Sequence, residues 1–98
     1  MLFIDGVCPV CEGGSIGFRR CGDALRLVLM CDECDAVWLD PAETSADSAL
    51  FPESPDFQVP GYTFSVASPA ARWATREEVS DAGWSDRLKG EGQASDGG

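Results

Sequence analysis

The 98-residue sequence contains no histidine. Imidazole is the commonest general base in enzymes and a frequent metal ligand, so its absence excludes a histidine-ligated metal and Ser-His or Cys-His catalytic pairs. Basic residues are also few, since 7 Lys and Arg stand against 17 Asp and Glu, for a net charge of -10. A nucleic-acid-binding protein needs a basic face to neutralise phosphates, so we expect no nucleic-acid partner. The charge suits a protein partner with a basic surface.

Long apolar runs are absent as well. No stretch is long enough to span a bilayer, and the first residues, "MLFIDGV", lack the basic start and apolar core of a signal peptide. The odd count of 5 cysteines argues against a secreted disulfide framework. We therefore expect a cytoplasmic protein with no membrane partner, in which thiols stay reduced and bind metals.

Four of the cysteines form the pattern C-x2-C-x19-C-x2-C, at Cys8, Cys11, Cys31 and Cys34. This spacing is typical of a zinc site. Two residues between cysteines allow a tight turn, a zinc knuckle, to direct both sulfurs to one point. Two facing knuckles supply a closed tetrahedron of thiolates about 2.3 Å from the metal. We therefore expect one structural Zn2+ ion with these four cysteines as its ligands.

Each knuckle carries a local signal of its turn. Pro9 fixes one backbone angle in the first knuckle. The residue after the second cysteine tends toward positive φ and is usually glycine, but here it is Glu12 or Asp35, of which Asp tolerates that conformation better. We expect Gly13 and Gly14, which follow Glu12, to relieve the backbone strain of the first knuckle one residue later.

The run Cys8-Pro9-Val10-Cys11, and Cys31-Asp32-Glu33-Cys34 followed by Val37-Trp38-Leu39-Asp40 and Glu43, resembles the transcription-factor-IIB-like zinc ribbon family of small bacterial proteins. The resemblance covers residues 8–43. It departs from the family at Ala36, where glycine is usual, and at Pro41-Ala42, where a polar-Gly pair is common. It implies a β-ribbon fold, the four cysteines as zinc ligands, and Trp38 and Leu39 packed beside the site. It implies little about activity, because fold and function separate readily.

Two other uses of the four cysteines are less favoured. A rubredoxin-like iron site usually keeps the glycines that are missing here. A thiol redox pair usually begins a helix, which lowers the thiol pKa, and neither pair here precedes a helical pattern. Cys21, the remaining cysteine, lies in a polar turn, and we expect an incidental exposed or half-buried thiol. The carboxylates of Asp32, Glu33 and Asp35 crowd the second knuckle, where we expect them to be solvated.

The pattern as a whole predicts a small, metal-stabilised, mainly β fold. It is a zinc ribbon, with two zinc knuckles on a β-hairpin or three-stranded sheet, and a short C-terminal α-helix. Strands are expected at 15–20, 25–30, 36–39 and 62–66, with a hairpin turn at 21–23. Thr75 and Glu78 form a capping box, and Gly83 followed by Trp84 is a helix stop, which predicts a helix at about 75–82 with Trp84 against Val79.

We divide the chain into a zinc ribbon at 1–43, an acidic, proline-rich linker or wrap at 44–60, a strand and helix packing on the ribbon at 61–88, and a disordered tail at 89–98. Leu50, Phe51 and Phe57 are the apolar residues expected to pin the acidic segment to the core.

We expect the arginines of the hairpin and the tryptophans to have mainly structural roles. We expect Arg19, Arg20 and Arg26 on a solvated face of the hairpin. Trp38, Trp73 and Trp84 are expected to complete a small core, and Trp73 is the one most readily assigned to a partner.

The function expected from these features is a non-enzymatic zinc-ribbon module that binds a protein partner. One alternative is an acidic inhibitor, such as an immunity protein or antitoxin, that masks a basic active site. Another alternative is a rubredoxin-like or thiol redox protein.

Overall fold

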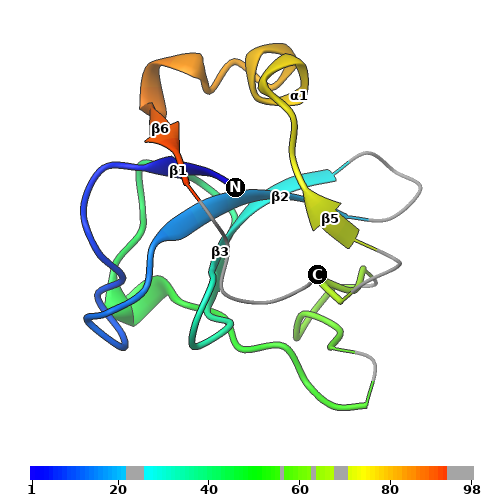
Figure 1. The fold of residues 1–98 in the computed structure, drawn as a ribbon. Helices are drawn as coiled ribbons and strands as arrows, with labels where there is room; N and C mark the ends of the chain where they lie inside the picture. Colours follow the sequence, from blue (N-terminus) through cyan, green and yellow to red (C-terminus); the bar gives the residue numbers. More distant parts are fainter. Residues whose placement is uncertain (22–25, 56, 63, 68–70, 93–98) are drawn as a thin grey trace.

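The computed structural model describes residues 1–21, 26–55, 57–62, 64–67 and 71–92. The six strands found there form one antiparallel sheet, accompanied by a short α-helix (Figure 1). The elements are β1 (Leu2–Ile4), β2 (Ile16–Cys21), β3 (Arg26–Cys31), β4 (Val37–Trp38), the 3-10 turn η1 (Ala46–Ser48), β5 (Ala71–Trp73), α1 (Arg76–Asp81), the 3-10 turn η2 (Ser85–Arg87) and β6 (Leu88–Glu91). The predicted mainly β fold with one short helix is confirmed. In the described part of the chain, no helix has the length and apolar character that crossing a membrane requires.

The β2–β3 hairpin forms the centre of the sheet. Every residue of β2 pairs with β3, from Ile16 opposite Cys31 to Cys21 opposite Arg26. Because successive side chains of a strand point to opposite faces, this register sorts the apolar residues of both strands onto two faces. The predicted hairpin is confirmed, although residues 22 and 23 of its expected turn lie outside the described residues.

The other edge of β2 has two neighbours. β1 pairs near its start, with Phe3 opposite Gly17, and β5 pairs near its end, with Arg20 opposite Arg72. β4 continues the sheet beyond β3, so β2, β3 and β4 are the three strands expected of the ribbon. β1, β5 and β6 enlarge this sheet.

β6 corrects the prediction that disorder begins at residue 89. It pairs with β1, with Phe3 opposite Gly90. A Cβ atom at Gly90 would lie 3.3 Å from the Phe3 ring, so the glycine gives that ring room to cover the strand. The prediction failed because this strand depends on a partner at the opposite end of the chain. Residues 93–98 of the expected tail lie outside the described residues.

The sheet is packed on both faces. We call one cluster the helix-side core; its buried members are Leu2, Ile4, Cys8, Ile16, Phe18, Leu29, Cys31, Ala36, Trp38, Ala74 and Val79. We call the other the loop-side core; its buried members are Cys21, Val28, Met30, Val37, Val59, Val66 and Ala71. The two clusters alternate along β2 and β3, as the period of a strand requires.

The expected acidic segment, residues 44–60, contacts the sheet at defined points. Leu50 forms a bridge with Val37 of β4, and their backbone hydrogen bonds are 2.7 and 2.8 Å long. Val59 is fully buried in the loop-side core. The prediction that Phe51 and Phe57 pin this segment is wrong, since they are 49% and 38% exposed. Adjacent residues of an extended chain point to opposite sides, so an inward Leu50 directs Phe51 outward.

The strand expected at residues 62–66 is not formed by the described residues there. Ser65 makes only an isolated bridge with Gln58, and the Tyr62 amide donates to the Val59 carbonyl in a turn. Gly61 has φ +83°, which bends the chain immediately before this segment. Val66 is nevertheless buried in the loop-side core, so the apolar pattern was real but reflected burial rather than strand pairing.

Helix α1 begins and ends as the sequence predicts. The Thr75 Oγ1 accepts a hydrogen bond from the Glu78 amide at 3.2 Å, and the Glu78 carboxylate accepts one from the Thr75 amide at 2.9 Å. At the other end Gly83 has φ +78°, and the Trp84 amide donates to the Val79 carbonyl at 3.0 Å. This is a Schellman ending. Trp84 packs against the helix-side core, which contains Val79.

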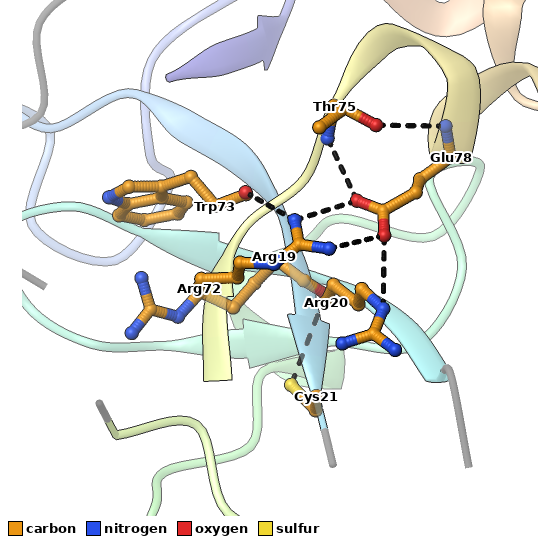
Figure 2. A network of polar contacts seen from close by, with 7 residues as sticks. All are labelled: Arg19, Arg20, Cys21, Arg72, Trp73, Thr75 and Glu78. Carbon is orange, nitrogen blue, oxygen red and sulfur yellow. Dashed lines mark hydrogen bonds and ion pairs between the residues drawn. The ribbon is translucent and has the colours of Figure 1, made fainter. Parts of the chain in front are cut away.

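A polar network joins α1 to the sheet (Figure 2). The Glu78 carboxylate accepts two hydrogen bonds from Arg72, at 2.9 and 2.6 Å, and lies 3.0 Å from the Arg20 Nε. The hydrogen bonds from Arg72 are the largest cause that lowers the pKa of Glu78 to about 2. The network therefore connects the first turn of α1 to both β5 and β2.

Arg19 corrects the expectation of a solvated arginine face. Its exposed fraction is 1%, its Nε donates to the Val66 carbonyl at 3.0 Å, and its guanidinium lies 4.7 Å from the centre of the Trp73 ring. Its position in β2 directs it toward the loop-side core, whereas Arg26 is exposed as expected. Trp73 is half-buried against Arg19, and its Nε1 is a buried donor without a hydrogen-bond partner in the described part of the chain.

Candidate metal centre

Two loops at one end of the sheet bring four sulfurs together. The first knuckle precedes β2 and the second follows β3, so the antiparallel pairing of these strands places both knuckles at the same end. Figure 1 shows these loops, dark blue and teal, away from α1. The Sγ atoms of Cys8, Cys11, Cys31 and Cys34 all lie within 4.8 Å of one another. The four cysteines are therefore close enough to hold one metal ion.

The first knuckle is a tight turn whose amides point at its sulfurs. The Glu12 amide donates to the Cys8 carbonyl at 2.9 Å and closes the turn. The Val10 and Gly14 amides donate to the sulfurs of Cys8 and Cys11, each at 3.4 Å. Glu12 itself has φ +59°, the left-handed conformation expected after a knuckle's second cysteine. Gly13 and Gly14 do not have positive φ, so the expectation that they relieve the knuckle one step later is wrong. These N–H dipoles stabilise negative charge on the sulfurs.

The second knuckle repeats this arrangement. The Cys31 amide donates to the Ala36 carbonyl at 2.8 Å. The Glu33 and Cys34 amides both donate to the Cys31 sulfur at 3.4 Å. Asp35 has φ +66°, again as predicted for the residue after a knuckle's second cysteine. Each loop is thus held by hydrogen bonds within its own short sequence, and the sheet places the two loops side by side.

The spacing of the sulfurs fits tetrahedral coordination. The Sγ atoms of Cys8 and Cys34 lie 3.6 Å apart, and those of Cys11 and Cys31 also lie 3.6 Å apart. A regular tetrahedron with metal–sulfur distances of about 2.3 Å has edges of about 3.8 Å. All four are free cysteines rather than disulfides. A set of four protein thiolates leaves no open position on a tetrahedral ion, which is typical of structural rather than catalytic sites.

The thiols differ in their ionisation. Hydrogen bonds from the Gly13 and Gly14 amides lower the pKa of Cys11 to about 7. Burial raises the pKa of Cys31 and of Cys34 above the ordinary value. Cysteine ligates metals as the thiolate, and burial deprives the Cys31 and Cys34 thiolates of solvation by water. A bound cation would stabilise their negative charge instead. The donor set therefore fits a thiophilic cation.

Two of the four cysteines belong to the hydrophobic core. Cys8 and Cys31 are fully buried in the helix-side core together with Trp38, whose Nε1 donates to the Ser45 carbonyl at 2.8 Å. Trp38 thus packs in the cluster that contains the Cys8 and Cys31 sulfurs, as the family resemblance implied. Leu39 does not, because it packs against the loop-side core. The two residues are adjacent in an extended segment and point to opposite faces.

Asp32 has a role that the sequence did not reveal. Its Oδ1 accepts a hydrogen bond from the Ser15 amide at 2.9 Å, and its own amide donates to the Ser15 carbonyl at 3.1 Å. These bonds connect the second knuckle to the residue before β2, so Asp32 is not merely solvated. An Asp after a knuckle cysteine is a ready acceptor, but its partner lies 17 residues away in sequence and no local pattern identifies it.

Cys21 lies apart from the four-cysteine cluster. It is the last residue of β2, is fully buried and belongs to the loop-side core. Burial raises the pKa of its thiol to about 11. The expectation of an exposed or half-buried thiol is wrong because β2 includes this residue and directs it inward.

Comparisons with known proteins leave the family open. No family model matches this chain, and no solved structure matches it. An uncharacterised protein, L48 of Acanthamoeba polyphaga mimivirus, is 26% identical over 91 residues, which cover 85% of this chain and 73% of that protein. Membership of the transcription-factor-IIB-like zinc ribbon family stays a prediction.

Proposed function

We propose that this chain is a non-enzymatic protein-binding module whose fold is stabilised by one structural zinc ion. The observation that carries the zinc proposal is the convergence of the Cys8, Cys11, Cys31 and Cys34 sulfurs within 4.8 Å. Zinc favours tetrahedral sites made of four thiolates, and cysteine-rich sites select it over harder cations. A rubredoxin-like iron site uses the same ligands and is the competing metal.

The position of the site explains what such an ion would stabilise. The first knuckle enters β2 and the second leaves β3, so one ion would hold together the ends of the two central strands. A chain of 98 residues buries a modest core, and small domains often depend on a metal for additional stability. The ion would act through folding rather than through chemistry.

The distribution of charge supports a partner with a basic surface. Residues 26–55 include seven acidic residues and a single basic one, Arg26. Five of the acidic side chains are exposed: Glu33, Asp40, Glu43, Asp47 and Glu53. Phe51 lies within the same part of the chain and is 49% exposed. Complementary charge accelerates association and selects partners, while exposed aromatic residues supply apolar contact area.

Native mass spectrometry of the intact protein tests the zinc proposal. The expected mass is that of the chain plus one zinc, without visible absorption. A red protein that absorbs visible light would identify iron. A chain isolated without metal that takes up no added zinc would overturn the proposal.

Affinity capture with matched charge variants tests the binding proposal. Glu43→Gln, Asp47→Asn and Glu53→Gln remove three exposed charges from residues 43–53. Glu77→Gln, Asp81→Asn and Asp86→Asn remove three exposed charges from α1 and η2. The first triple variant is expected to lose a partner captured from an extract of the source cells, and added salt should have the same effect. The second should retain it. Turnover of a substrate by the purified chain, without a specific partner, would contradict the proposal.

The net charge of -10 favours a second candidate function, that of an acidic inhibitor masking a basic active site. This candidate predicts that the captured partner is an enzyme with a basic active site. Adding one equivalent of the chain should then abolish the activity of that enzyme, and the first triple variant should inhibit it more weakly. A partner that stays fully active in the complex would contradict the inhibitor role, and only the general protein-binding role would remain.

A further inference from the structure

The four clustered cysteines differ in their exposure to solvent. Cys11 is exposed and Cys34 half-buried, whereas Cys8 and Cys31 are fully buried. Gly14 lies directly over the Cys31 sulfur, since a Cβ atom at this glycine would be 2.5 Å from it. A reagent approaching from solvent therefore meets Cys11 first.

We propose that Cys11 is a modification site, where a small uncharged hydroperoxide oxidises the four-cysteine centre, and that Cys31 completes the reaction as the second half of a disulfide. This inference rests on the proposed zinc site. It adds a chemical reactivity to a centre to which the proposed function gives only a structural role.

The reaction balances as a two-electron oxidation. The Cys11 thiolate attacks the nearer peroxide oxygen, the O–O bond breaks, and the departing alkoxide or hydroxide takes up a proton, which leaves a sulfenic acid on Cys11. The Cys31 thiolate then attacks the Cys11 sulfur, the S–O bond breaks, and hydroxide departs as water after protonation. Two thiols and one hydroperoxide give one disulfide, one alcohol or water from the peroxide, and a further water.

A short sulfur–sulfur distance favours Cys31 as the partner. Its sulfur lies 3.6 Å from that of Cys11, so the pair must close by about 1.5 Å to reach the disulfide length of about 2.05 Å. The other pair at this distance, Cys8 and Cys34, includes no exposed residue. Cys21 is buried in the core on the opposite face of the sheet. Once Cys11 and Cys31 are joined, two thiolates remain, too few for a closed tetrahedral zinc site.

Charge around Cys11 selects an uncharged reagent. Glu12 follows Cys11 in the chain and Glu33 approaches the same turn, its Oε2 3.9 Å from the Cβ position of Gly13. Both carboxylates are on exposed residues, on a chain of net charge -10. Anions such as glutathione disulfide are repelled at low salt, whereas a neutral hydroperoxide is not.

Peroxide titration of the zinc-loaded full chain tests the assignment. Zinc release is followed with a chromogenic chelator, and disulfides are mapped by fragmentation of non-reduced peptides. We expect zinc release in proportion to a Cys11–Cys31 disulfide. A first disulfide between any other two cysteines, Cys8–Cys11 and Cys8–Cys34 included, would overturn the proposal, as would oxidised protein that keeps its zinc. If the purified protein neither contains zinc nor takes it up, the proposed zinc site is wrong. This outcome is distinct from zinc-loaded protein that forms a different disulfide, which contradicts only the oxidation proposal.

Alkylation of the wild-type chain avoids variants that fail to fold. With limiting iodoacetamide, which is neutral, the first adduct on the zinc-loaded chain is expected at Cys11. A first adduct on another cysteine, or simultaneous modification of all four ligands, would show that Cys11 is not the most accessible cysteine.

Iodoacetate, the anionic analogue, tests the role of charge. For each reagent, the rate of reaction with the folded chain is divided by its rate with the denatured chain. At low salt this normalised rate should be several-fold lower for iodoacetate than for iodoacetamide. Glu33→Gln should bring the normalised rates of the two reagents closer together, whereas Glu77→Gln on α1 should leave them unchanged. If the ratio of the iodoacetate rate to the iodoacetamide rate is the same in wild type and Glu33→Gln, the proposed selection by charge is rejected.

Discussion

Gly14 lies against the sulfur of Cys31, so closely that any side chain at this position would collide with it. A Cβ atom built there would be 2.5 Å from the Cys31 Sγ and 3.0 Å from the Asp32 Oδ1. The neighbouring Gly13 differs, because its Cβ position meets nothing nearer than 3.9 Å. Two adjacent glycines thus have different roles, and only the second lets the knuckles approach each other.

Gly14→Ala is therefore expected to displace the Cys31 sulfur and to weaken zinc binding about tenfold or more, a loss typical of disturbed groups beside a metal site. Competition with a chelator of known affinity measures this change. Gly13→Ala is the matched control and should bind zinc nearly as tightly as wild type. Equal affinities for the two variants would show that the knuckles do not need this close approach.

Cys31 and Cys21 are a matched pair for testing the ligand set, since both end a central strand and both are fully buried. Cys31→Ala is expected to abolish stoichiometric zinc binding and cooperative unfolding. Cys21→Ala should bind one zinc and lose about 1 kcal/mol of stability, as expected for a small truncation in a core. Metal analysis and thermal unfolding of both variants check this. Loss of zinc from Cys21→Ala would contradict the assigned ligands.

Removal of the proposed zinc should unfold most of the chain. Structural zinc sites contribute about 10 to 16 kcal/mol in small peptides, as much as the whole stability of a typical domain. A strong chelator is therefore expected to eliminate the cooperative thermal transition seen by circular dichroism, and added zinc should restore it. An unchanged melting temperature in the chelator would show that the two cores suffice without metal.

Glu78→Gln should lower stability by about 1 kcal/mol, because it removes charge from the contacts with Arg72 and Arg20 while a Gln can still take part in a capping box. The pKa of Glu78 is lowered from 4.5 to about 2, so its stabilising contribution is fully present above pH 4.5 and is lost only as the pH falls toward 2. The difference from wild type in urea unfolding should therefore be constant from about pH 6 to about pH 8. Glu77→Gln is the control for general charge effects. A difference that changes over this range would point to another titrating group.

Local signals account for what the sequence predicted well. The left-handed conformations of Glu12 and Asp35 follow from the geometry of a knuckle. The start of α1 at Thr75 and its end at Gly83 follow from a capping box and a glycine stop. Each of these features depends on atoms a few residues apart, which a short sequence pattern specifies.

Predictions failed where the environment of a residue depends on distant segments. Arg19 was expected in solvent, but residues 47 and 52 positions later in the chain accept its hydrogen bonds. Residues 89–91 of β6 were expected to be disordered, but β6 pairs with β1. Strand pairing between distant segments has no local signature, because its energy comes from a partner that the local sequence does not contain.

The sequence alone determined the two knuckles, the hairpin between them and the limits of the helix, since these are set by cysteine spacing, apolar alternation and capping residues close together in the chain. Cysteine spacing also predicted that the four sulfurs converge, which the structure confirms, since they lie within 4.8 Å of one another. Only the tertiary structure decided that Cys11 is the exposed one, and that Cys21 and Arg19 lie inside. The exposure of a side chain depends on which distant segments cover it, and that depends on how the whole sheet is assembled.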